Sequence, residues 1–140
     1  MMNSQKWIGW SLTGLMAALI VLTAIPDVLR VPAAVSVMMR LGYPRYLLLL
    51  LGTAKLAAVV AVLGPVGPRI KEWAFAGLTF DVAGALYSHL SVGDPPSGWM
   101  PAVVGLVLVG AAYVAFRMRL NVDAFADGPT VAGSRLAVKA

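Results

Sequence analysis

Long apolar runs separated by short polar segments dominate this sequence. Four such runs lie at residues 7–25, 46–63, 73–90 and 99–116. The first and last hold no Lys, Arg, Asp or Glu, and the two middle runs hold one each. Each run approaches the roughly 20 apolar residues that a helix needs to cross a bilayer. The pattern predicts an all-α protein, a four-helix transmembrane bundle formed by about residues 1–120 as a single domain.

The first run has a competing interpretation as a cleaved signal peptide. It is longer than a usual signal-peptide core, and the residues that follow it, Thr23 to Pro26, make a poor cleavage site. These two features favour an uncleaved first transmembrane helix.

The segment between the first two runs, residues 26–44, carries three charged side chains and is too polar to cross a membrane. Pro32 suits the first position of a helix, and Gly42 suits a C-terminal cap. We therefore expect a short amphipathic helix at about Pro32–Leu41, lying at the membrane interface. An ordered loop is the alternative.

Proline and glycine separate the later runs. The segments 64–68 and 93–98 are rich in both and predict tight turns. Arg117 and Arg119 end the last run. The tail, residues 121–140, has no sustained period and is expected to be mobile.

Composition supports a membrane protein. Sixty per cent of the residues are apolar and 12% are charged, against about 45–50% and 25% in soluble domains. The absence of cysteine excludes disulfides, thiol chemistry and iron–sulfur clusters in this chain. The net charge of +5 lies mostly beside the apolar runs, which favours contact with membrane lipid and argues against nucleic acid as a partner.

Four crossings would put both termini on the same side of the membrane. The basic residues expected on that side are Lys6, Arg69, Lys71, Arg117, Arg119, Arg135 and Lys139. Those expected on the other side are Arg30, Arg40 and Arg45. Basic residues accumulate on the cytoplasmic side, so both termini are predicted to be cytoplasmic.

Lys55 and Asp81 are the charged residues within the two middle runs. Helices joined by a tight turn are antiparallel, so both side chains are expected at a similar depth near the bilayer centre. A lone charge there costs about 2.5–3.5 kcal/mol, and we therefore predict that the two residues pair. The pair either lines a polar pocket that binds a ligand or moves a proton, or is a buried bridge that only fixes helix register.

Small and hydroxyl residues recur at three- and four-residue steps around Asp81. Gly77, Gly84 and Ser88 share its helix face, and Gly52 precedes Lys55 by one turn. We expect Gly52, Gly77 and Gly84 to allow close helix packing. Ser88 is a candidate ligand-binding residue beside the charged pair.

His89 is the only histidine and the fourth candidate ligand-binding residue. Asp94 follows it closely, but one histidine and one aspartate fall short of the three or four ligands of a transition-metal site. A haem would need an axial histidine deeper in the bundle. We predict no metal site and no catalytic residue, and the cofactor stays unspecified. A proton exit, a lipid headgroup contact or a helix-end hydrogen bond to Asp94 are the open roles.

Several short motifs together resemble the DoxX-like family of small four-helix membrane proteins. They are Leu41-Gly42-Tyr43-Pro44, Leu51-Gly52, Lys55-Leu56, Lys71-Glu72-Trp73-Ala74, Ala76-Gly77, Phe80-Asp81, Gly84-Ala85, Ser88-His89 and Gly93-Asp94. The resemblance covers about residues 26–116 and implies mainly an architecture. The family takes its name from a small subunit associated with thiosulfate:quinone oxidoreductase, and most DoxX-like members have no assigned activity. Members of other branches are linked to redox complexes or to assembly of partner membrane proteins. Many relatives have an acid at or near the Lys55 position, so the Lys–Asp combination looks like the feature of a branch.

These observations lead to three hypotheses for a protein of the bacterial inner membrane. The first is an accessory subunit of a membrane redox complex, without catalytic activity of its own, that binds a quinone or other lipophilic molecule through Lys55, Asp81, Ser88 and His89. The second is a small proton-coupled transporter with Asp81 as the carrier. The third is a structural assembly factor. A partner membrane protein or a second copy of the chain is expected to associate with it.

Overall fold

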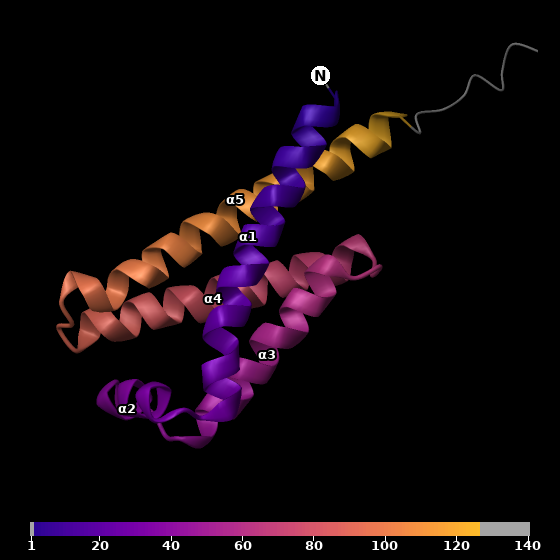
Figure 1. Cartoon of the computed structure of the whole chain (residues 1–140). Helices are drawn as coiled ribbons and strands as arrows, with labels where there is room; N and C mark the ends of the chain where they lie inside the picture. The colour runs from indigo at the N-terminus through magenta and orange to yellow at the C-terminus, as the bar shows by residue number, and fades with distance from the viewer. Residues whose placement is uncertain (1, 127–140) are drawn as a thin grey trace, which may run out of the picture.

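The computed structural model describes the backbone of residues 2–126 and the side chains of residues 7–122. Within this part the chain forms five helices and no strand. They are α1 (Met2–Leu29), α2 (Pro32–Arg40), α3 (Tyr46–Leu63), α4 (Pro68–Ser91) and α5 (Pro96–Ala126) (Figure 1). The all-α prediction is confirmed for the described residues, and α2 covers the segment where a short helix was expected.

Three helices are long and apolar enough to cross a membrane. Their candidate spans are Trp7–Leu29, Tyr46–Leu63 and Pro96–Val122. Helix α4 has 24 residues, enough to cross the roughly 30 Å hydrocarbon layer at about 1.5 Å per residue. Its mean hydropathy is too low for a candidate span. Polar side chains that include Asp81 and His89 lower its hydropathy. The fourth crossing therefore stays a prediction.

Four helices surround a common apolar core. Helices α1 and α4 each pack on both α3 and α5. In Figure 1, α1 crosses α5 at an angle, whereas α4 and α5 run side by side. The buried core residues are Met16, Ala17, Ile20, Val59, Val62, Phe75, Leu78, Val82, Val109, Ala112 and Phe116. All four helices supply apolar side chains to this one cluster, which fixes their relative positions.

Helices α1, α2 and α4 end in the same type of turn. The residue after each helix, or next to it, has a positive φ: Arg30 at 50°, Gly42 at 84° and Gly93 at 70°. The next backbone N–H then donates to a carbonyl five residues earlier: Val31 to Pro26, Tyr43 to Met38 and Asp94 to His89. This pattern satisfies carbonyls that the helix end leaves unpaired. The predicted cap at Gly42 is confirmed. After these turns, Tyr43 lies beside Ser88 and Asp94 lies beside His89.

Helices α1, α4 and α5 are longer than the apolar runs that predicted them, and α1 and α5 extend furthest at their C-terminal ends. Helix α1 continues through Pro26 to Leu29, so Asp27 is helical and not part of a loop. Helix α5 continues to Ala126 and includes the first six residues of the expected tail. Charged side chains end an apolar run but not a helix, because an exposed helix tolerates them. The rest of that tail, residues 127–140, lies outside the described part.

The glycines predicted to allow close packing fall into two groups. A Cβ on Gly52 would lie 2.7 Å from the Val28 side chain and 2.9 Å from the Val28 backbone nitrogen. Gly52 therefore allows α3 to approach α1, and not α4. At Gly77 and Gly84, a Cβ would have no neighbour within 4 Å, and both glycines are exposed. The expectation that they bring α4 close to another helix is wrong for the described chain.

Gly52→Ala is expected to destabilise the protein by about 1–3 kcal/mol, because the new methyl group overlaps a backbone atom of α1 that cannot rotate away. Gly77→Ala is the matched control. It adds the same group in open space and is expected to be neutral or stabilising by up to about 1 kcal/mol through helix propensity. Thermal unfolding of the two variants in detergent measures the difference, and equal effects would contradict the close approach at Gly52.

Candidate ligand-binding site

The ammonium group of Lys55 on α3 lies between two carboxylates from different helices. Its Nζ is 2.8 Å from Oδ2 of Asp27 on α1 and 3.6 Å from Oδ2 of Asp81 on α4. The Lys55 side chain is 14% exposed and each aspartate side chain 16% exposed. The predicted proximity of Lys55 and Asp81 is present, but Asp27 is the nearer partner.

Asp27 was not predicted as a site residue because it lies in the segment 26–44. The three charged side chains of that segment led to the interpretation that it does not cross the membrane. The helical period contained a signal for Asp27. Ile20 and Ala24 are buried on one face of α1, and Asp27 continues that face at the next three-residue step.

Gly52 makes the contact between Asp27 and Lys55 possible. A Cβ at Gly52 would lie 3.0 Å from Asp27 Cβ, so this glycine is the point on α3 over which the end of α1 passes. Lys55 lies one helical turn further along α3, on the same face. The close approach of the two helices thus brings the carboxylate within hydrogen-bond distance of the ammonium.

A cavity of about 190 Å³ lies next to this group of charges. All four packed helices contribute to its wall. Lys55 and Asp81 supply charged groups and His89 supplies an imidazole, whereas Ile20, Val82 and other apolar or small side chains form most of the rest. Three of the four predicted ligand-binding residues therefore line one cavity.

Ser88, the fourth candidate, does not line that cavity. Its buried hydroxyl donates a hydrogen bond to the Gly84 carbonyl at 2.7 Å and lies 2.9 Å from the hydroxyl of Tyr43. Tyr43 belongs to the segment that joins α2 to α3. Ser88 thus fastens this segment to α4, and its contacts in the structure are with the protein itself.

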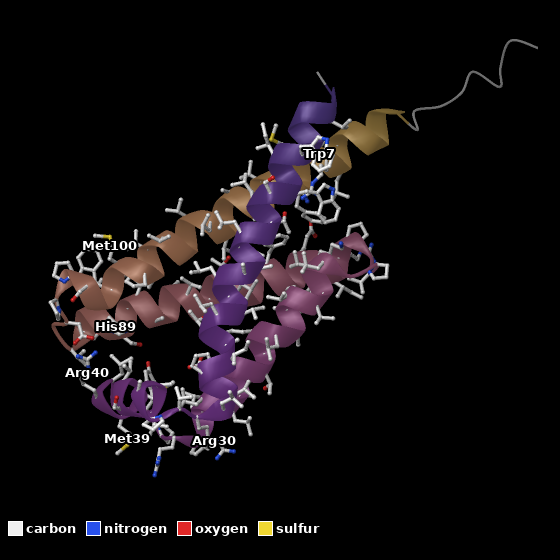
Figure 2. The ribbon with its side chains drawn as sticks, in the orientation of Figure 1. Trp7, Arg30, Met39, Arg40, His89 and Met100 are labelled. Atoms are coloured by element: carbon white, nitrogen blue, oxygen red, sulfur yellow. The ribbon has the colours of Figure 1, made fainter. Side chains whose placement is uncertain are left out.

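His89 makes the helix-end contact considered from the sequence. Its Nδ1 lies 2.5 Å from Oδ2 of Asp94, and the same oxygen accepts a hydrogen bond from Arg40 of α2 at 3.0 Å. Figure 2 shows Arg40 of α2 and His89 near the end of α4 on the same side of the molecule, and Asp94 bonds to both. One imidazole nitrogen of His89 therefore contacts the Asp94 carboxylate, and His89 also lines the cavity.

The arrangement offers both donors and acceptors to a ligand. A lysine ammonium carries three N–H donors, and the aspartates face it from two sides. Asp81 borders the cavity with carboxylate oxygens that can accept further hydrogen bonds. With all three groups ionised, two carboxylates surround one ammonium and the formal charge of the group is −1. The site therefore favours a ligand that donates a hydrogen bond over one that carries a negative charge.

Residues 2–126 form helices and no strand, with three candidate spans and an ion-paired group among apolar side chains. These features are those of a small integral membrane protein. The family model of the DoxX-like family matches residues 11–112, and the chain belongs to that family. No curated protein and no solved structure matches the chain. The matched residues include Asp27, Lys55 and Asp81, so all three charged residues lie in the part of the chain that defines its family membership.

Lys55→Met is expected to be the most destabilising single change at this site, by about 3–5 kcal/mol, because it leaves two largely buried carboxylates without their counter-charge. Asp27→Asn still leaves a Lys55–Asp81 pair and is expected to cost about 1–3 kcal/mol, the value of a hydrogen bond to a charged group. Thermal unfolding in detergent ranks the two variants.

A triple variant provides the control for this prediction. Combining Lys55→Met with Asp27→Asn and Asp81→Asn removes all three charges, so most of the stability lost in Lys55→Met should return. A triple variant as unstable as Lys55→Met would show that lost packing, and not unpaired charge, causes the defect.

Proposed function

We propose that this protein is a ligand-binding accessory subunit of a membrane redox complex. Its ligand is a small lipophilic molecule with a polar head, such as a quinone. The supporting observation is the cavity of about 190 Å³ in which Lys55 and Asp81 form a polar spot on a largely apolar wall. The protein holds the molecule and has no catalytic step of its own.

The hydrogen-bonding groups of the cavity suit both redox forms of a quinone. A carbonyl oxygen of the oxidised form can accept a hydrogen bond from the Lys55 ammonium. A hydroxyl of the reduced form can donate to the Asp81 carboxylate. The volume is below the roughly 300–1,000 Å³ of typical ligand pockets, so it suits a single ring, with an isoprenoid tail leaving between the helices into lipid.

The proposal includes a topology for the bacterial inner membrane. Helices α1, α3, α4 and α5 form a transmembrane four-helix bundle with both termini in the cytoplasm, and the basic-residue distribution supports this orientation. The position of Asp81 inside the helix cluster supports a crossing by α4, because its charge faces Lys55 and not lipid. Helix α2 lies at the interface, with Val35 and Met38 packed on Leu48.

One observation favours proton-coupled transport as a second candidate. Asp81 and His89 line the same cavity, and both side chains can carry a proton. In this alternative Asp81 alternates between its pairing with Lys55 and a protonated form. The third hypothesis, an assembly factor, would use the charged group only to hold the helices together.

Binding of decylubiquinone to the detergent-solubilised full chain tests the proposal. Asp81→Asn should weaken binding about tenfold or more, because it alters a charged group in the cavity wall. Asp27→Asn is the matched control, since Asp27 bonds to Lys55 but does not line the cavity. The affinity of this variant for decylubiquinone should stay within about threefold of wild type. Native mass spectrometry of the same sample reports the bound molecule and its stoichiometry.

Two outcomes would contradict this function. Absence of decylubiquinone binding to the stable wild-type protein, together with no co-purifying lipophilic molecule, would favour the assembly role. A pH-driven flux in liposomes that Asp81→Asn abolishes would favour transport.

A further inference from the structure

Helix α4 carries large aromatic side chains at regular intervals on a face that no other helix covers. Trp73, Phe80 and Tyr87 lie seven residues apart, and they are 82%, 81% and 73% exposed. Helix α4 packs on α3 and α5 through other positions, which include the buried Phe75 and Leu78. The three rings therefore contribute nothing to the core of the described chain.

Small residues alternate with these rings. Gly77, Gly84 and Ser91 also lie seven residues apart, and all three are exposed. A Cβ at either glycine would have no neighbour within 4 Å. Rings and small residues together recur at steps of four and three, which is the spacing of the contact positions in a coiled coil. We call these six positions the α4 face: Trp73, Gly77, Phe80, Gly84, Tyr87 and Ser91.

Contact with lipid would account for the rings but not for the glycines. Glycine is less favourable inside a helix than every residue except proline, and here it leaves hollows that no described side chain of this chain fills. In membrane proteins, glycine is enriched where the backbone of a neighbouring helix approaches closely. The alternation of rings and hollows therefore favours a helix, and not lipid, as the occupant of the α4 face.

The α4 face is complementary to itself. Its rings and its small residues repeat with the same period of seven, so a ring of one helix can pack between two glycines of an identical helix. None of the six residues is charged, so two identical faces meet without repulsion between like charges. A twofold axis along the membrane normal keeps both copies in the same orientation, which makes the two α4 helices parallel.

The exposed rings supply a contact of adequate size. A buried aromatic side chain removes about 150–250 Å² from its surroundings, and most of each ring on the α4 face is exposed. Three rings from each of two copies can therefore bury on the order of 700–1,200 Å² in total. A specific protein interface needs about 1,000 Å², so the α4 face is large enough for a dimer.

We propose that two copies of this protein form a dimer in the membrane by packing their α4 helices in parallel through the α4 face. Phe80 of each copy lies between Gly77 and Gly84 of the other. The two helices cross at the shallow angle typical of a heptad repeat. This inference rests on the membrane crossing by α4 proposed above, but not on the identity of the ligand.

Disulfide cross-linking tests the dimer, because the chain contains no cysteine. Gly77→Cys places a thiol on the α4 face, and Gly110→Cys, the matched control, places one on α5. Both glycines are exposed with open space at the Cβ position, and both lie 14 residues from the turn that joins α4 to α5. Oxidation of membranes that contain the full chain should link Gly77→Cys into a dimer at least about fivefold faster than Gly110→Cys, because a disulfide needs Cα atoms within about 7 Å.

Filling a hollow of the α4 face provides the second test. Gly84→Leu should lower the dimer fraction about tenfold or more, because the added side chain overlaps the partner's ring. Gly110→Leu is the matched control and should keep the dimer fraction within about twofold of wild type. Energy transfer between N-terminally labelled copies in mixed micelles measures the dimer. Both variants should retain wild-type helical content by circular dichroism, since a Cβ at either position has no neighbour within the chain.

Equal cross-linking of Gly77→Cys and Gly110→Cys would overturn the proposal, and so would an unchanged dimer fraction in Gly84→Leu. Labelling of Gly77→Cys by a membrane-impermeant maleimide in sealed vesicles would show that α4 does not cross the membrane, and the parallel dimer would fail with that topology. Neither labelling nor cross-linking would show that α4 crosses but faces lipid or a different protein.

Discussion

The positive charge of Lys55 inside an apolar helix cluster is the constraint on which the rest of this structure depends. A lone charge in that position costs several kcal/mol, and two carboxylates offset the cost. Asp27 and Asp81 come from two other helices, and Gly52 permits the close approach that brings Asp27 to the ammonium. The packing of the fold and the chemistry of the site are therefore set by the same contacts.

Lys55 also connects two helices that do not pack directly on one another. In the described part of the chain, α1 and α4 each pack on α3 and α5 but not on one another. The long lysine side chain on α3 reaches a carboxylate on each of them. Because a buried charge left without its partner is costly, these ion pairs favour one register of α1 and α4 along α3, in addition to the apolar packing. A purely apolar core would leave that register less specific.

Sequence analysis located the apolar helices and brought Lys55 and Asp81 together, because both follow from hydropathy and depth along a helix. It missed Asp27 because the charged segment 26–44 was interpreted as lying outside the apolar helices, whereas helix α1 continues past Pro26 to Leu29. It also assigned Gly77 and Gly84 to packing, although spacing alone does not reveal which face of α4 meets another helix. The end of α5 was placed too early, since Arg117 and Arg119 mark where apolar residues stop and not where the helix does.

The charges around Lys55 also limit which ligands the cavity beside it can hold. Lys55 and Asp81 line this cavity, whereas Asp27 reaches the ammonium from outside its wall. An anion that enters would approach the Asp81 carboxylate as well as the ammonium, and the ammonium is already shared by two carboxylates. An uncharged polar head avoids this repulsion and can still accept a hydrogen bond from Lys55 or donate one to Asp81. The ion pairs that hold the helices together therefore favour a neutral ligand over an anionic one.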